Sequence, residues 1–388
     1  MIRYSPHPAG VTQITDEGVP VRDKPFRVIV WGPGRLGAIC IREISLNPAL
    51  ELAGVRAYSE AKDGVDAGEL IGIGPLGVKA STDVEAMLAI DCDAVIYSAL
   101  DIGIYHTDDE IISLLEAGRN VITTLPYQHL EAVRDQAFID RLEAACRKGG
   151  SVFHATGVDP DTVCDRVLPA LTTMCTDIRH VQIQENWDVG AFGVDTLKVI
   201  GFGQQREAVE ANAESLSFGD NYGKMVTHAW AETVGVTYDR RTVERSFPVA
   251  PEEIRTPSGL VIEKGTVCCY TTRWSGFVDS INPDKPFFQI EYNWHAGGTV
   301  VPEHVKADVT GWVISIEGRP SIRTVIDMKA DFETRGRYMV PGNPNFEASY
   351  HAIAAPCLQA IPHVVKAEPG ILPVFHYPYH WVPDLLAV

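Results

Sequence analysis

Short apolar runs alternate with segments of helical periodicity along the first 165 residues of the chain. The strand-like runs cover residues 26–31, 50–59, 93–99, 120–124 and 151–157. The segments with apolar side chains on one helical face cover residues 35–46, 84–89, 107–117 and 130–148. Such runs are typical of strands buried on both faces of a sheet. Their regular alternation with helices predicts an α/β domain with a parallel sheet.

Beyond about residue 165, polar and apolar positions alternate, as they do in half-exposed strands. Strand-like runs cover residues 179–187, 265–277, 287–294, 306–317 and 321–328, and helix-like segments cover 208–215 and 226–235. This order predicts an α+β domain with a mostly antiparallel sheet. A last helical segment, 346–365, contains Pro356 and Pro362. We expect them to kink or split it, because proline lacks a backbone donor and clashes with the preceding turn.

The composition and charge narrow the range of partners. The chain has 388 residues, 45% of them apolar and 22% charged, an ordinary balance for a globular protein of two or three domains. Its 33 basic and 51 acidic residues give a net charge of −18. Such a surface repels phosphate backbones and anionic lipids. Since no basic run offsets it, and no apolar stretch approaches the roughly 20 residues that span a bilayer, we expect neither nucleic acid nor membrane as a partner.

Two further features favour a cytoplasmic location. Residues 1–25 are irregular and lack the apolar core of a signal peptide. The eight cysteines form no C-x-x-C pair and most lie in apolar segments, as buried free thiols of a reducing compartment do.

A glycine-rich hexapeptide, GPGRLG at residues 32–37, directly follows the first strand and begins the first helix. In this context the pattern G-x-G-x-x-G predicts a dinucleotide-binding turn. The first glycine permits the tight turn, the second lets the backbone approach a pyrophosphate, and the third lets helix and strand pack closely. The N–H groups that begin the helix would face the anion. The candidate cofactor-binding residues of this turn are Gly32, Pro33, Gly34, Arg35, Leu36 and Gly37.

The end of the second strand is where such a domain selects the ribose of its cofactor, about 20 residues after the turn. No Asp or Glu occurs there before Glu60. An acid would accept from a ribose 2′-hydroxyl and repel a 2′-phosphate, so its absence favours NADP(H), with NAD(H) as the alternative. The candidates here are Arg56, Tyr58, Ser59 and Lys62, and those at the ends of later strands are Ser98, Ala99, Thr123, Gly157 and Asp159. The alternative is that Arg56 and Lys62 are ordinary solvated surface residues.

Several segments together resemble a known family. VIVWGPGRLG (28–37), the stretch 66–78 and LLEAGRNVITT (114–124) are similar to the dihydrodipicolinate reductase-like proteins. ATGVDP (155–160) and the segment 352–371 resemble the branch of 2,4-diaminopentanoate dehydrogenase and native amine dehydrogenases, with Asp159 where that branch has Asn. The basic motif of the lysine-pathway reductase is absent, which argues against dihydrodipicolinate reduction.

The resemblance implies a Rossmann domain closed by the C-terminal helix, NAD(P)H chemistry, and a homodimer built on the sheet of the second domain. We therefore expect three parts of the chain. These are an N-terminal arm (1–25), a Rossmann dinucleotide-binding domain (26–165) completed by residues 346–388, and an α+β domain (166–345) for substrate binding and dimerisation.

The resemblance also implies reductive amination, in which ammonia and a ketone or aldehyde give a primary amine, or the reverse. Such a site needs a carboxylate that holds ammonia, stabilises the cationic iminium and shuttles protons. It also needs a dry, apolar pocket. The branch has its acid early in the helix 107–117, which corresponds to Asp108 or Asp109. Asp101 and Glu110 lie close by. The alternative is that these acids only cap the helix, with Thr107 and Glu110 as a capping box.

Aromatic residues of the second domain are candidates for the walls of a substrate pocket. The candidates are Trp187, Phe192, Tyr222, His228, Trp230, Tyr270 and Trp274. The alternative is that the aromatic residues belong to the core and that His228 is a satisfied core or surface histidine. Glu185 and Asp188 either reach the cleft or face water.

We therefore expect an NAD(P)H-dependent oxidoreductase that acts on a C–N bond, with a small carbonyl or amine substrate and ammonia. The alternatives are a reductase of another carbonyl or imine substrate and a non-catalytic NADP-binding sensor. No metal site is expected, because Pro378 opposes the helix that would align His376 with His380.

Overall fold

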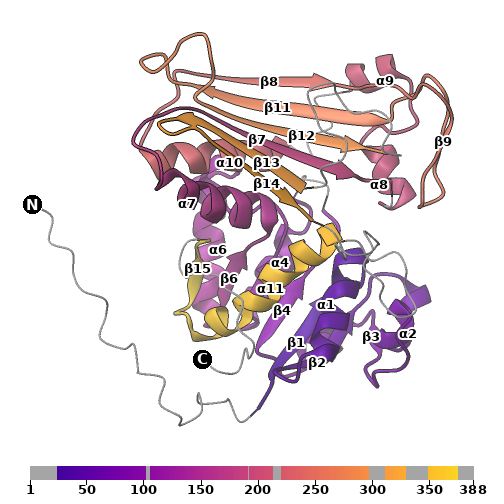
Figure 1. Ribbon diagram of the computed structural model, residues 1–388. Helices are drawn as coiled ribbons and strands as arrows, with labels where there is room; N and C mark the ends of the chain where they lie inside the picture. The colour runs from indigo at the N-terminus through magenta and orange to yellow at the C-terminus, as the bar shows by residue number, and fades with distance from the viewer. Residues whose placement is uncertain are drawn as a thin grey trace, which may run out of the picture.

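The computed structural model describes residues 24–101, 105–190, 192–212, 220–296, 311–328 and 348–374. Figure 1 shows a parallel sheet between helices in the lower half and a second, mostly antiparallel sheet above it. This arrangement confirms the predicted fold class. Most of the predicted arm, and the chain from residue 375 with His376 and His380, lie outside the described residues. None of the described helices is long and apolar enough to cross a membrane.

The lower sheet has seven strands, and every adjacent pair is parallel. The strands are β1 (Phe26–Trp31), β2 (Leu50–Arg56), β3 (Ala80–Ser81), β4 (Ala94–Tyr97), β5 (Val121–Thr123), β6 (Val152–Ala155) and β15 (Gly370–Leu372). Their order in space is β15-β6-β5-β4-β1-β2-β3, so the direction of winding reverses between β1 and β4. Open α/β sheets bind ligands at the carboxyl ends of the strands beside such a switch point.

Helices cover both faces of this sheet. They are α1 (Arg35–Leu46), α2 (Ala67–Ile71), α3 (Val84–Leu88), α4 (Asp108–Glu116), α5 (Leu130–Val133), α6 (Gln136–Gly149) and α11 (Ala348–Lys366), with the short turn η1 (Glu60–Lys62). Alternate residues of β1 enter opposite cores. Val28 and Val30 pack with α1 and α11, whereas Ile29 and Trp31 pack with α4 and α6. Burial of both faces explains why β1 is an unbroken apolar run.

The C-terminal elements complete this first sheet although the second sheet lies between them in the chain. Strand β15 pairs with β6, and α11 buries Ala354, Cys357 and Ile361 completely in the core beside α1. Helix α11 is continuous over Pro356 and Pro362, so the expected split is wrong. Both prolines are buried, and the packing of this face offsets the backbone hydrogen bonds that proline cannot make.

The predicted helix 130–148 is instead two helices, α5 and α6. The break falls at Arg134, whose backbone is extended. Asp135 then caps the new helix, because its side chain accepts from the backbone N–H of Phe138 at 2.8 Å.

The upper sheet has six strands in the order β14-β13-β7-β12-β11-β8. The strands are β7 (Ile178–Asp188), β8 (Arg240–Ser246), β11 (Cys269–Phe277), β12 (Phe288–His295), β13 (Gly311–Gly318) and β14 (Ile322–Asp327). Among the described strands of this sheet, only β7 and β12 pair in parallel. The remaining elements are η2 (Val158–Val167), α7 (Leu168–Thr172), α8 (Val194–Val199), α9 (Arg206–Ala211), α10 (Asp220–Val234) and the ribbon β9 (Ile254–Arg255) and β10 (Val261–Ile262). Strand β8 was not predicted. The predicted domain boundary at 165 falls within η2, and the division into domains stays a prediction.

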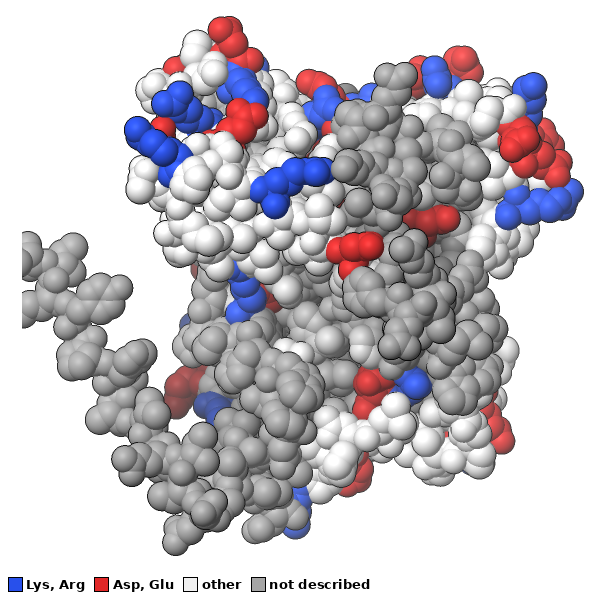
Figure 2. All heavy atoms as spheres, in the orientation of Figure 1, with Lys and Arg blue, Asp and Glu red and all other residues white. Residues whose placement is uncertain are grey.

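The two faces of the upper sheet differ in character. One face carries apolar side chains such as Ile183, Phe288 and Ile290, which pack with α10 and the η2–α7 segment. The other face is polar, and Gln289 links strands there through Gln182 and Ser275. On the described part of the surface in Figure 2, acidic and basic side chains are interspersed and form no continuous basic patch.

Candidate active site

The glycine-rich turn between β1 and α1 has the shape of a pyrophosphate cradle. Gly32 adopts φ +102°, and a Cβ there would come within 2.9 Å of the Ala99 nitrogen. A Cβ on Gly37 would collide with the carbonyl oxygen of Gly32, whereas a Cβ on Gly34 would meet nothing within 4 Å. The outer glycines thus close the turn against neighbouring backbone. The middle one leaves open space before the first N–H groups of α1, so the turn fits a dinucleotide.

The end of β2 presents cations instead of an acid. The Arg56 guanidinium lies 4.7 Å from the centre of the Tyr58 ring and 5.8 Å from that of Trp31. Arg56 is 8% exposed, and its Nε and Nη1 have no hydrogen-bond partner among the described residues. Lys62 donates to the carbonyl of Pro33 at 3.0 Å, and Ser59 accepts from the N–H of Ala61. A 2′-phosphate at this end of the turn would supply the acceptors that Arg56 lacks.

Other predicted cofactor residues hold the carboxyl edge of the sheet together. Ser98 donates to the carbonyl of Gly32 at 2.8 Å, and Thr123 donates to the carbonyl of Tyr97 at 2.9 Å. Asp159, in contrast, lies apart from the turn and faces a cavity.

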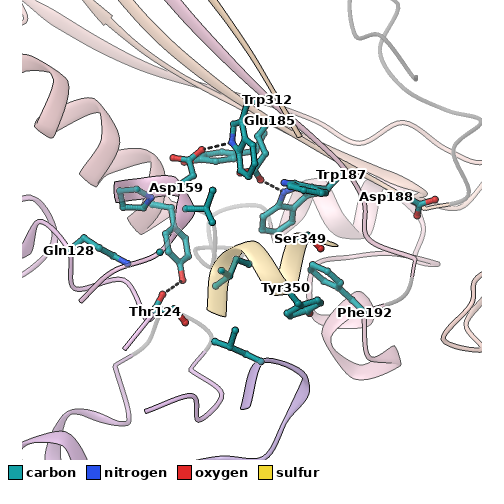
Figure 3. Close-up of a pocket in the computed structure, with 18 of the residues that line it drawn as sticks. Thr124, Gln128, Asp159, Glu185, Trp187, Asp188, Phe192, Trp312, Ser349 and Tyr350 are labelled. Carbon is teal, nitrogen blue, oxygen red and sulfur yellow. Dashed lines mark hydrogen bonds between the residues drawn. The ribbon is translucent and has the colours of Figure 1, made fainter. Parts of the chain in front are cut away.

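This cavity, of about 240 Å³, lies between the carboxyl edge of the lower sheet and the apolar face of the upper one (Figure 3). The lower sheet and its helices contribute Leu36, Thr124, Gln128, Gly157, Ser349, Tyr350 and Ile353. The linking segment contributes Val158, Asp159 and Pro160, and the upper sheet contributes Glu185, Trp187, Asp188, Tyr270, Tyr292, Trp294 and Trp312. Phe192 comes from the loop after β7, and Tyr222 comes from α10. Leu36 belongs to the glycine-rich motif, so the cavity adjoins the predicted cofactor turn.

Aromatic rings form most of the wall. Trp187 and Trp312 meet edge to face, with ring centres 5.2 Å apart. Phe192 and Tyr350 lie 5.4 Å apart and bring α11 against the loop after β7. Such walls exclude water and present π faces, which attract a cation.

Two carboxyl groups, Asp159 and Glu185, meet in this aromatic cavity. Each is hydrogen-bonded to the other. The indole of Trp312 donates to Asp159 at 3.1 Å, and the indole of Trp294 donates to Glu185 at 2.8 Å. The Cys164 thiol also donates to Asp159, at 2.8 Å.

Burial raises the pKa of both carboxyl groups. The pKa of Glu185 lies well above its ordinary value because of burial and of the neighbouring Asp159. Burial also raises the pKa of Asp159, although its hydrogen bonds with Cys164 and Trp312 oppose the rise. Two adjacent carboxyl groups cannot both ionise cheaply, so burial and proximity favour a pair that shares one proton. It can therefore hold a cation and exchange a proton.

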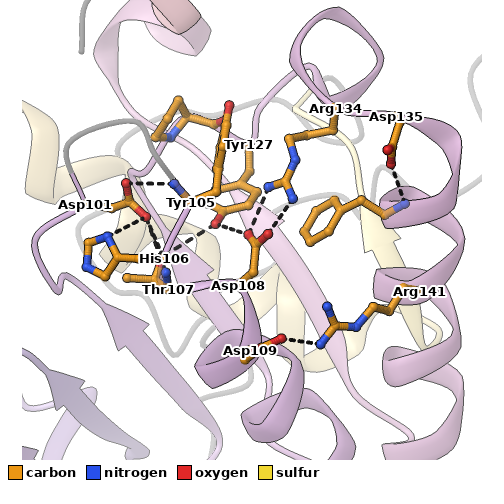
Figure 4. Close-up of polar contacts among 12 residues, drawn as sticks. Asp101, Tyr105, His106, Thr107, Asp108, Asp109, Tyr127, Arg134, Asp135 and Arg141 are labelled. Atoms are coloured by element: carbon orange, nitrogen blue, oxygen red, sulfur yellow. Dashed lines mark hydrogen bonds and ion pairs between the residues drawn. The ribbon is translucent and has the colours of Figure 1, made fainter. Parts of the chain in front are cut away.

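The acids that begin α4 lie elsewhere (Figure 4). Arg134 binds Asp108 through both nitrogens of its fork, one of them at 2.9 Å, and the Tyr127 hydroxyl donates to Asp108 at 2.7 Å. Asp109 forms an ion pair with Arg141, and its side chain is 83% exposed. Neither acid lines the cavity, so their predicted catalytic role stays untested while their geometry favours helix anchoring.

The two other acids near α4, Asp101 and Glu110, also accept hydrogen bonds from neighbouring residues. Asp101 accepts from the hydroxyl of Thr107 at 2.9 Å and from the N–H of Tyr105. Glu110 accepts from the hydroxyls of Tyr58 and Tyr97. The predicted capping box does not form, because the side chain of Thr107 makes no capping hydrogen bond.

Four of the predicted pocket residues line the cavity: Trp187, Phe192, Tyr222 and Tyr270. The other three do not. Trp230 stacks on Phe288 in the core, with ring centres 5.9 Å apart. Trp274 packs directly against Gly223 of α10, and His228 pairs with Glu131 at 3.1 Å. His228 and Trp230 lie on α10, and Trp274 of β11 packs against that helix. Helical spacing alone does not reveal which side chains pack around α10 and which reach the cavity.

Sequence reasoning missed several residues of the cavity, notably Tyr292, Trp294, Trp312 and Tyr350. The alternation along β12 places Tyr292 and Trp294 on the face that carries Ile290, which is a signal the strand pattern contained. Among the described residues, no group of three His, Cys, Asp or Glu side chains could hold a metal ion.

Comparison with known proteins agrees with this architecture. Residues 26–104 match the family model described as dihydrodipicolinate reductase, N-terminus, and residues 162–382 match that of the 2,4-diaminopentanoate dehydrogenase C-terminal domain. The chain is 29% identical to an amine dehydrogenase of Streptomyces virginiae over 376 residues, which cover 90% of this chain and 95% of that protein. It is 37% identical to a 4-hydroxy-tetrahydrodipicolinate reductase of Prochlorococcus marinus over 78 residues, 20% of this chain and 25% of that protein.

Among solved structures, the amine dehydrogenase of Mycobacterium smegmatis superposes with a TM-score of 0.73 at 20% identity, covering 92% of this chain and 98% of that one. The scyllo-inositol dehydrogenase of Lactobacillus casei, solved with NAD(H), gives a TM-score of 0.53 at 14% identity, with 88% and 90% covered. At these identities the likeness is one of fold.

Proposed function

The chain belongs to the family of the 2,4-diaminopentanoate dehydrogenase C-terminal domain and is an NAD(P)-dependent oxidoreductase, and from this premise we propose that it is an amine dehydrogenase. In the forward direction a ketone or aldehyde, ammonia, one proton and NAD(P)H would give a primary amine, water and NAD(P)⁺. The similarity to the Streptomyces virginiae amine dehydrogenase supports the proposal.

The observation that carries this proposal is the Asp159–Glu185 pair. It is a buried carboxyl pair in an aromatic cavity beside the cofactor turn, and burial raises the pKa of both groups. A plain carbonyl reductase needs a proton donor for the oxygen but no anion for a cationic intermediate. Reductive amination needs both, because the iminium carries a positive charge before reduction.

The carboxyl pair and the aromatic rings of the cavity would have different roles. The negative charge of the pair would hold ammonia or ammonium and stabilise the iminium, and its proton would go to the hydroxyl that leaves as water. The rings of Trp187, Trp312 and Trp294 would keep water away, so that the iminium is reduced and not hydrolysed. The bound nicotinamide cofactor supplies the hydride.

The turn fits a nicotinamide dinucleotide, held by Gly34 and the first N–H groups of α1. We propose NADP(H) as the preferred cofactor, because Arg56 has two unpartnered nitrogens at the ribose end and no acid competes for them. We further propose a cytoplasmic location, which the eight free cysteines support.

A homodimer through the polar face of the upper sheet is also proposed. The ladder of Gln182, Gln289 and Ser275 and the ion pair of Arg273 with Glu291 give this face paired polar groups. Sedimentation equilibrium should give twice the mass of the chain, and a monomer at micromolar concentration would refute the dimer.

Oxidation of NADPH and NADH with a panel of ketones and aldehydes, with and without ammonium, tests the activity. Ammonium-dependent oxidation with formation of the amine is the expected result. Equal rates without ammonium would replace the proposal by simple carbonyl reduction. Cofactor binding without oxidation under any condition would favour a sensor.

A further inference from the structure

Tyr292 lines the cavity and is not used by the chemistry described above. It lies on β12 directly opposite Glu185 of β7 in the parallel register. It is 4% exposed and lines the cavity, with its ring centre 6.4 Å from that of Trp294. Its side chain therefore emerges from the same sheet face as that of Glu185.

The Tyr292 hydroxyl has no hydrogen-bond partner among the described residues. Among the neighbouring tyrosines, the Tyr222 hydroxyl donates to the carbonyl of Thr124 at 3.4 Å. The Tyr270 hydroxyl also lacks a partner among the described residues, but in the sheet register Tyr270 lies opposite Trp294, whereas Tyr292 lies opposite Glu185. Buried polar groups are nearly always satisfied, so a buried hydroxyl on a cavity-lining side chain with no partner among the described residues points to an acceptor on a ligand.

We propose that the Tyr292 hydroxyl binds the carbonyl oxygen of the substrate and holds it while ammonia adds and water leaves. This inference rests on the proposed amination and adds to it the group that positions the oxygen. The carboxyl pair faces the nitrogen, and Tyr292 faces the oxygen. The substrate carbon then lies between two polar contacts in a cavity that is otherwise aromatic.

The phenol is suited to donate a hydrogen bond without losing its proton. Burial and the charges of Asp159 and Glu185 raise the pKa of Tyr292 well above its ordinary value, so it stays protonated. As the C–N bond forms, the carbonyl π electrons move to the oxygen, and the donated hydrogen bond stabilises the growing charge. The oxygen takes one proton from the attacking nitrogen as the carbinolamine forms, and a second from the carboxyl pair. The C–O bond then breaks and water departs.

The variant Tyr292→Phe removes only the hydroxyl and keeps the ring that packs on Trp294. We expect kcat/KM for ammonium-dependent reduction to fall about 100-fold, the size of effect of one donor to a developing oxyanion. The matched control is Tyr238→Phe, which removes a part-buried hydroxyl that donates to the carbonyl of Thr227 at 3.1 Å, and Tyr238 does not line the cavity. Its kcat/KM should stay within about threefold of the wild-type value.

The reverse reaction separates a role at the oxygen from a structural one. Amine oxidation transfers hydride before any oxygen enters, and water adds to the iminium only afterwards. In stopped-flow experiments with amine and NADP⁺, Tyr292→Phe should form the first equivalent of NADPH at the wild-type rate and then turn over slowly. An equal loss in the first turnover, or wild-type kcat/KM in the forward direction, would overturn the inference.

If Tyr292→Phe does not fold, a measurement on the wild-type chain tests the inference instead. With NADP⁺ bound, the secondary alcohol of an accepted ketone should inhibit at least about tenfold more strongly than the hydrocarbon of the same shape, because only the alcohol offers an acceptor. Equal inhibition would overturn the inference. If the wild-type chain shows no ammonium-dependent turnover while it reduces ketones, the proposed amination itself fails, and the role of Tyr292 in it fails with it.

Discussion

The acids that begin α4 and the carboxyl pair of the cavity have opposite surroundings. Asp108 and Asp109 each have an arginine, and Asp108 has the Tyr127 hydroxyl as well. The described partners of Asp159 and Glu185 are two indoles, a thiol and each other. A carboxylate neutralised by a guanidinium is stable and inert, whereas an unneutralised buried pair keeps a proton available near neutral pH. From this difference we propose the second cluster, Asp159 and Glu185, as the catalytic one.

The largest expected effect is a loss of activity, which should follow from substitutions in the carboxyl pair and not from those in the acids of α4. Glu185→Gln keeps the shape and an acceptor for Trp294 but removes the shared proton and charge, so we expect kcat for amination to fall about 1,000-fold. Asp159→Asn should lose activity to a similar extent, because the two groups act as one unit. Steady-state NADPH oxidation with ketone and ammonium measures both.

Asp108→Asn is the matched comparison and should keep turnover within a few-fold of the wild-type value. If it loses as much as Glu185→Gln, the α4 acid is catalytic, as the family resemblance implies. The comparison between the clusters would then be reversed.

Local patterns identified the cofactor turn because six consecutive residues carry it. Residues 32–37 follow β1 and begin α1 with the predicted bounds, and no distant contact is needed to recognise them. The same holds for the order of strands and helices, which sets the fold class.

The cavity could not be predicted in this way, because its parts meet only through the tertiary fold. Trp312 reaches Asp159 across 153 positions of sequence, and Glu185 is set beside Tyr292 by the register of β7 and β12. A one-residue shift of either strand would turn these side chains to the other face. Asp108 had the expected position in the chain, but its pairing with Arg134 depends on the break between α5 and α6.

The pH dependence of amination also distinguishes the buried carboxyl pair from the acids of α4. The pair binds a second proton as the pH falls, which removes the negative charge that the iminium needs. Since burial raises both pKa values, kcat/KM should fall about tenfold per pH unit on an acidic limb well above the ordinary carboxyl range of about 4. The profile is measured at constant free ammonia. A limb near 4 would indicate a solvent-exposed carboxyl group in place of the buried pair.

Arg56 and Arg134 extend the comparison to cations, since Arg134 has a carboxylate partner and Arg56 has none that is described. Arg56→Ala should raise the KM for NADPH about 30-fold, the equivalent of roughly 2 kcal/mol for hydrogen bonds to a charged group. The KM for NADH should not change, which makes NADH the internal control. An equal rise for both cofactors would mean that Arg56 supports the fold of the turn and not the 2′-phosphate.

The smallest effects concern stability at neutral pH, measured by urea denaturation. Asp108→Asn should lower the free energy of unfolding by about 2 kcal/mol, because it leaves the part-buried Arg134 without its charged partner. Asp109→Asn should change it by less than about 0.5 kcal/mol, as exposed ion pairs do. Asp159→Asn should raise it. The pKa of Asp159 is higher in the folded than in the unfolded chain, so ionisation opposes folding as the pH rises above the unfolded value of about 4. A loss of stability at Asp159 would show that its charge anchors the fold, as that of Asp108 does.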